Sequence, residues 1–139
     1  MKTDKRYHLL NRQRKHRIDS DGVRRFLSGL LKEVGRPDAS FSVVFVTDKV
    51  MRAYNLRYRH IDKTTDVLSF RGEDGYLGDI LISTETAWKQ TRKSPTLSFD
   101  DNIRRLLLHG LLHLSGYDHE TDNGEMRAIE RRLRRKFQC

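Results

Sequence analysis

The chain has 139 residues, which suits one domain over residues 1–139 that buries roughly two-thirds of the surface exposed in the unfolded chain. No apolar run is long enough to cross a membrane, and residues 1–11 lack the apolar core of a secretory signal. The 28 lysines and arginines outnumber the 19 acidic residues and give a net charge of +9, which favours nucleic acid as a partner, although a basic surface also serves solubility.

Strand and helix patterns alternate in the first third of the chain. Residues 6–11 have the pattern of a weak strand, and the acidic and hydroxyl residues at 19–21 can cap a helix that Gly35 and Pro37 end. That helix has a single apolar face, which needs a flat apolar surface to pack against. Residues 40–46 are β-branched and aromatic, so they predict the strand that supplies this surface.

The middle of the chain predicts a helix followed by a hairpin. Thr47 can cap the helix, whose apolar stripe consists of Val50, Met51, Tyr54 and Tyr58. Residues 65–70 and 77–83 have strand patterns, and the glycines and acids between them are typical of a turn. The short distance between the two strands indicates a hairpin.

Three helices complete the prediction. The first begins at Ser83 or Thr84 and ends before Pro95, and Ser98 caps the second. Residues 106–114 of the second helix are almost wholly apolar, as in a buried helix. The last helix begins at about Asp122 and has strongly basic outer faces. We therefore expect an α+β fold with α/β-like alternation, in which one small mixed sheet of about four strands packs with about five helices.

Three of the six histidines lie within eleven residues, at His109, His113 and His119. The first two are one helical turn apart on the buried helix, so their rings share a face, and Gly116 can end the helix and turn the chain back toward them. Three neutral imidazoles without a fourth protein ligand are typical of a catalytic zinc site with one open position. The terminal Cys139 is a poor candidate for a ligand, cannot form an internal disulfide, and fits a reducing, cytoplasmic location.

The spacing of these histidines equals that of the metzincin peptidases, but one part is missing. Those enzymes carry a glutamate general base directly after the first histidine, and here that position is Gly110. Peptidase chemistry is therefore disfavoured. A zinc ion that activates water or polarises a phosphoryl oxygen remains, and the many arginines suit phosphodiester chemistry.

The histidine segment, residues 108–119, resembles the signature of the YbeY family of bacterial rRNA maturation factors, also described as endoribonucleases. A second block agrees in order and spacing: residues 55–59, 65–70 and 77–80. Met126 and Glu130 suit the C-terminal helix of that family. The resemblance extends over residues 11–130, which is nearly the whole chain.

The resemblance implies a single-strand-specific, metal-dependent endoribonuclease that acts at the 3′ end of small-subunit rRNA and in ribosome quality control. It implies zinc bound by His109, His113 and His119, in a cleft beside a small mixed sheet. It points to Arg59 as a residue for RNA binding or catalysis. The expected partners are single-stranded RNA, including rRNA, and the small ribosomal subunit. A membrane is not expected among the partners.

The chain departs from the family pattern around its second block. Thr64 and Arg71 stand where the family usually has prolines, and neither change removes a candidate ligand. The turn between Phe70 and Leu77 is short, so a function that depends on a longer loop there is not expected.

Several alternatives remain open at the level of sequence. Asp66, Ser69 and Asp118 lie within the motifs, but turn and sheet hydrogen bonding explains them as well as proton transfer does. The metal is zinc or another borderline ion such as nickel, because imidazole binds several. The alternative functions are a zinc hydrolase of peptides or small molecules and a non-catalytic, metal-containing ribosome-assembly factor.

Overall fold

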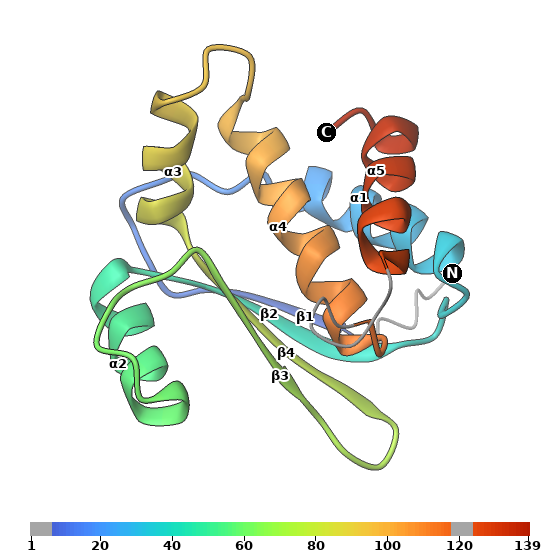
Figure 1. Ribbon diagram of the computed structural model, residues 1–139, viewed down its shortest axis with the longest axis horizontal. Helices are drawn as coiled ribbons and strands as arrows, with labels where there is room; N and C mark the ends of the chain where they lie inside the picture. The colour runs from blue at the N-terminus through green and yellow to red at the C-terminus, as the bar shows by residue number, and fades with distance from the viewer. Residues whose placement is uncertain (1–6, 118–123) are drawn as a thin grey trace.

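The computed structural model describes residues 7–117 and 124–139. Strands and helices follow one another in the predicted order, and their arrangement is an α+β fold (Figure 1). The elements are β1 (Tyr7–Asn11), α1 (Ser20–Glu33), β2 (Ser40–Val46), α2 (Asp48–Arg59), β3 (Val67–Arg71), β4 (Tyr76–Ser83), α3 (Thr84–Arg92), α4 (Phe99–Leu114) and α5 (Glu125–Phe137). Within the described residues, no helix is long and apolar enough to span a membrane.

The four strands form one mixed sheet in the order β1-β2-β4-β3. β1, β2 and β4 are parallel, whereas β3 runs antiparallel to β4 and forms the predicted hairpin with it. β3 is therefore an edge strand of the sheet, with β4 as its one neighbour. This position matters because the candidate site lies along β3.

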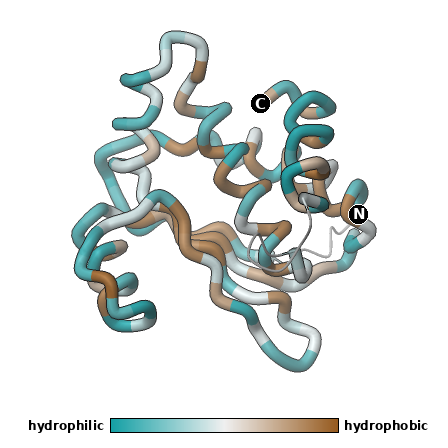
Figure 2. Tube along the Cα trace, viewed as in Figure 1, coloured by the Kyte–Doolittle hydropathy of each residue, from teal (hydrophilic) through white to brown (hydrophobic). Residues whose placement is uncertain are grey.

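The two faces of the sheet are covered unequally. Side chains alternate between the faces along each strand, so that Ile80 and Ile82 of β4 belong to the main core while Leu81 points into a smaller cluster. The main core lies between the sheet and helices α1, α4 and α5, and α4 crosses its centre (Figure 1). Hydrophobic residues are concentrated along the strands and in the middle of α4 (Figure 2). α2 covers the opposite face over the smaller cluster.

The predicted apolar stripe of α2 is buried at only one of its positions. Met51 is fully buried, whereas Val50, Tyr54 and Tyr58 are 37%, 39% and 53% exposed. The buried polar residue of this helix is Asn55, whose side-chain amide donates to the carbonyl of Lys63 at 2.9 Å. The two tyrosines of the stripe stay partly exposed because α2 packs on a small cluster, in which the strand residues next to Met51 are few.

Local signals explain where most helices begin. The side chains of Asp19, Thr47, Ser83 and Ser98 each accept a hydrogen bond from a backbone N–H in the first turn of the helix that follows. α5 differs, since Gly124 precedes it in the left-handed region at φ +99°. The predicted start of the last helix, at about Asp122, lies outside the described residues.

Candidate metal centre

His109 and His113 lie on the last turns of α4, where the helix reaches the edge of the sheet. Their Nε2 atoms are 3.1 Å apart, and the ring centroids are 4.6 Å apart. The predicted shared face is confirmed. The side chain of His109 is 30% exposed, so the pair is accessible from solvent rather than enclosed in the core.

The geometry of this pair fits a metal ion, because two imidazole nitrogens on adjacent helical turns point to one place. α4 ends at Leu114, and Gly116 has φ +103°, so the predicted turn after the helix is present. His119, the expected third ligand, lies outside the described residues. Over residues 7–117 and 124–139, no group of three potential metal-binding side chains forms.

Glu130 of α5 contacts the other nitrogen of His109. Its carboxylate oxygens lie 3.2 and 3.3 Å from Nδ1, and Glu130 is only 8% exposed. Because a carboxylate only accepts hydrogen bonds, this contact favours a proton on Nδ1 and directs the lone pair of Nε2 toward the candidate metal position. A carboxylate behind a ligand histidine is a common partner in zinc sites.

The sequence alone does not predict a role for Glu130 at the site. A signal was present, because this acid lies among the inward positions of α5, four residues after Met126 and three before Leu133, both fully buried. A buried acid on an apolar face needs a partner. The partner lies 21 residues away on another helix, and local pattern does not identify it.

Gly110 faces the sheet and not the histidine cavity. A Cβ atom at this position would lie 2.9 Å from Cγ2 of Ile80 and 3.2 Å from Oγ of Ser69. The hydroxyl of Ser69 donates to the carbonyl of Gly110 at 3.4 Å, so strand and helix meet closely here. A glutamate base at this position would have no room, which removes the peptidase arrangement on structural grounds as well.

A cavity of about 320 Å³ joins the histidines to α2. Its lining consists of Arg59, Val67, Leu68, Ser69, His109 and His113. Arg59 is the last residue of α2, and His60 then takes a left-handed conformation that ends the helix. The structure thus brings the predicted arginine and two of the predicted ligands to one cavity, across the edge strand β3.

Besides Ser69, the sequence offered Asp66 and Asp118 as candidates for proton transfer. Asp66 lies in a neighbouring cavity on another side of His109, and its carboxylate accepts from the N–H of Val67 at 2.7 Å and from the amide of Gln90 at 3.0 Å. These bonds stabilise the start of β3 and its contact with α3. They are hydrogen bonds of the kind that the structural interpretation of Asp66 predicts. Asp118 lies outside the described residues.

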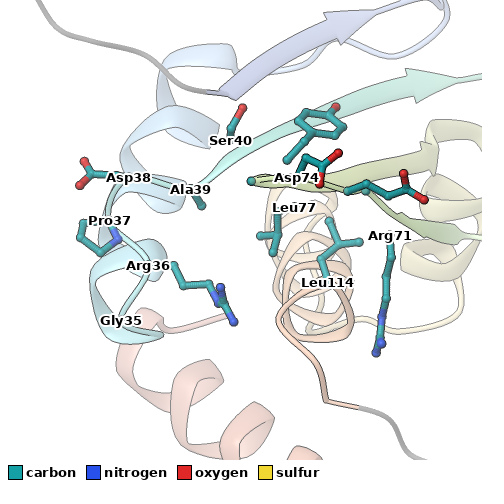
Figure 3. Close-up of a pocket in the computed structure, with 14 residues that line it drawn as sticks. Gly35, Arg36, Pro37, Asp38, Ala39, Ser40, Arg71, Asp74, Leu77 and Leu114 are labelled. Carbon is teal, nitrogen blue, oxygen red and sulfur yellow. The ribbon is translucent and has the colours of Figure 1, made fainter.

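A larger hollow of about 560 Å³ lies between the α1–β2 loop and the β3–β4 turn (Figure 3). It has acids as well as arginines in its lining and contains none of the predicted site residues. Arg71, which stands at a usual family proline, donates from this region to the carbonyl of His113 at 3.3 Å. That bond adds a second donor to a carbonyl that also accepts from the N–H of Gly116 at 3.1 Å, at the C-terminal end of α4 next to the histidine pair.

Known proteins resemble this chain over most of its length. A family model described as endoribonuclease YbeY matches residues 8–138. The chain is 38% identical over 138 residues to an endoribonuclease YbeY of Geobacter metallireducens, with 93% of this chain and 91% of that protein covered. It is 49% identical over 103 residues to one of Nautilia profundicola, with 72% and 73% covered.

A solution structure of a Thermotoga maritima protein has the same fold. The TM-score is 0.67 at 22% identity, and the match covers 95% of this chain and 91% of that one.

Proposed function

The chain belongs to the endoribonuclease YbeY family, and from this premise we propose that it is a metal-dependent endoribonuclease that cleaves single-stranded RNA. The proposed biological substrate is rRNA, at the 3′ end of the small-subunit molecule and in ribosome quality control. The observation that carries the proposal is the cavity in which Arg59 lies with His109 and His113.

The proposed metal is zinc, held by His109, His113 and His119. Its support is the convergence of two imidazole nitrogens at 3.1 Å and the buried carboxylate of Glu130 behind one of the rings. When bound, such an ion lowers the pKa of water and polarises a phosphoryl oxygen. Nickel and related borderline ions suit the same imidazoles, and metal analysis distinguishes them.

Arg59 supplies positive charge on the α2 side of the cavity. A guanidinium binds phosphate oxygens with two parallel N–H donors and stabilises the negative charge that grows on them during cleavage. The histidines approach the same cavity from α4, so a phosphodiester within it lies between the arginine and the imidazoles. The net charge of +9 adds long-range attraction for RNA.

The two alternative functions have weaker support. A peptidase of the metzincin kind lacks its base, because the position of Gly110 is filled by β3 and β4. A structural metal in an assembly factor would be expected to sit among enclosed ligands, whereas His109 is 30% exposed at a cavity.

One experiment tests the proposal directly. Wild type and His113→Ala are compared for bound metal and for cleavage of a single-stranded RNA and the same RNA in a duplex. We expect one zinc per chain and single-strand cleavage in wild type, and loss of both in the variant. Cleavage that survives loss of the metal would point to a contaminating nuclease and refute the mechanism.

The role of Arg59 needs a charge-matched control. Arg59→Glu should retain zinc and lose RNA cleavage, whereas Arg25→Glu, an equal charge change on an exposed residue of α1, should retain both. Equal activity of the two variants would remove Arg59 from the mechanism.

A further inference from the structure

α2 exposes two stacked tyrosines beside the histidine cavity. The rings of Tyr54 and Tyr58 are 5.9 Å apart with an interplanar angle of 16°, and they remain 39% and 53% exposed. The rings of Tyr58 and Phe70 of β3 make a T-shaped contact, with centroids 5.2 Å apart. We call Tyr54, Tyr58 and Phe70 the aromatic platform.

The platform is joined to the cavity at two points of the chain. Tyr58 directly precedes Arg59 on α2, and Arg59 lines the cavity. Leu68, which packs in the same small cluster as Phe70, lines it too. The cavity and the platform are therefore neighbours beside the edge strand β3.

Positive charge accompanies the exposed rings. The guanidinium of Arg57 lies 5.5 Å from the centroid of Tyr58, and Arg59 follows two residues later. Flat aromatic faces next to arginines are the combination with which proteins bind single-stranded nucleic acid, because bases stack on the rings while the cations bind the backbone.

We propose that the aromatic platform stacks a base of the RNA strand next to the phosphodiester that lies in the histidine cavity, with Tyr58 as the main contact. This proposal rests on the proposed function, and it names the part of the protein that selects single strands. A base in a duplex is already stacked and paired, so it cannot reach a tyrosine without the cost of unstacking. For a base in a single strand, this free-energy cost is much smaller.

If the platform has only a structural role, a different response to mutation is expected. In that case Tyr58 would only attach α2 to β3, and any apolar side chain of similar size would serve. Tyr58→Phe and Tyr58→Leu separate the two roles, because phenylalanine keeps a flat aromatic face and leucine keeps apolar packing on Phe70 without one. The exposed Trp88 of α3, which does not line the cavity, gives the control Trp88→Ala.

The test combines these variants with altered RNA. The cleavage site in an unstructured oligoribonucleotide is first mapped with wild type, and a series of oligonucleotides then carries one abasic nucleotide at each position around that site. Binding is measured in the His113→Ala background, where cleavage does not interfere. Unfolding by urea is followed for every variant, so that a loss of stability is recognised separately.

We expect one abasic position beside the cleavage site to weaken binding by roughly 5- to 100-fold, in line with the usual contribution of one stacked base. Tyr58→Ala and Tyr58→Leu should weaken binding of intact RNA to a similar extent and show no further loss with the abasic RNA. Tyr58→Phe and Trp88→Ala should bind as the parent does.

Two results would overturn the inference. If the losses of binding free energy caused by the abasic nucleotide and by Tyr58→Ala add in full, the ring and the base do not contact each other. If Tyr58→Leu binds RNA with unchanged affinity, apolar packing alone matters. Failure of wild type to cleave any single-stranded RNA refutes the proposed function, whereas cleavage that does not depend on Tyr58 refutes only the platform.

Discussion

The carboxylate of Glu130 lies 3.2 Å from Nδ1 of His109 and joins α5 to α4 at the candidate metal centre. A ring held in this way would lose less conformational freedom when Nε2 binds a metal, and the acceptor beside Nδ1 favours the Nδ1–H tautomer. The two helices therefore contribute different things to the site: α4 carries the nitrogens, and α5 fixes the orientation of one of them.

Glu130→Gln should lower zinc affinity by about 10- to 100-fold, because the amide replaces a charged acceptor by a neutral one of the same shape. A titration against a competing chelator measures the change, and Glu73→Gln in the exposed β3–β4 turn is the control. Equal zinc affinity in the two variants would show that the contact of Glu130 with His109 does not tune the site.

Gly110→Ala should destabilise the protein although alanine is the better helix former. The exchange gains up to about 1 kcal/mol of helix propensity, but the new methyl group meets Ile80 Cγ2 at 2.9 Å, and overpacking of this kind costs about 1–3 kcal/mol. Urea unfolding measures the difference. Ile80→Ala removes the opposing atoms, so the double variant should be more stable than the sum of the single effects predicts.

A gain in stability of Gly110→Ala would contradict this account. It would mean that α4 moves away from the sheet at little cost in free energy. The argument that position 110 has no room for a glutamate base would then fail.

Asp48 should make stability depend on pH in the acidic range. Burial raises the pKa of its carboxyl, but hydrogen bonds from Ser83, Thr86 and Lys89 outweigh burial and lower the pKa to about 2. Because the folded pKa lies below the unfolded value of 3.8, the stabilisation is complete above that value and is lost as the pH falls toward 2. The shift corresponds to roughly 2 kcal/mol.

The free energy of unfolding is measured from pH 7 to pH 2 for wild type and Asp48→Asn. The variant should be less stable at neutral pH, and the difference should shrink below about pH 4. A constant difference over the whole range would show that ionisation of Asp48 contributes nothing. Asp48 connects the start of α2 to β4 and α3, so its loss also tests how firmly the helix that carries Arg59 is held.

The order of elements could be predicted because each has a strong local signal. The β-branched run at 40–46 matches β2 residue for residue, and the hydroxyl caps at Thr47 and Ser98 are where the helices begin. The shared face of His109 and His113 follows from helical spacing alone. The roles of His119 and Arg59 stay predictions.

Contacts between distant elements could not be predicted in the same way. Helical periodicity placed Tyr54 and Tyr58 on an apolar stripe, but it carries no information about where the sheet ends beneath the helix. The partner of Glu130 and the close approach of Gly110 to Ile80 depend likewise on how helices are placed on the sheet. These tertiary relationships are the ones that distinguish the site from a generic pair of histidines.

The sheet order has a consequence for the newly synthesised chain. β4 is the last strand in sequence but lies between β2 and β3, so β3 has no partner strand until β4 has left the ribosome. The histidines of α4 follow later still, and Glu130 later than both. Long-range parallel pairing is slow to form, and it must be complete before the cavity exists. An incomplete chain therefore has no assembled histidine cavity, and the proposed cleavage of RNA has to wait until synthesis has passed α5.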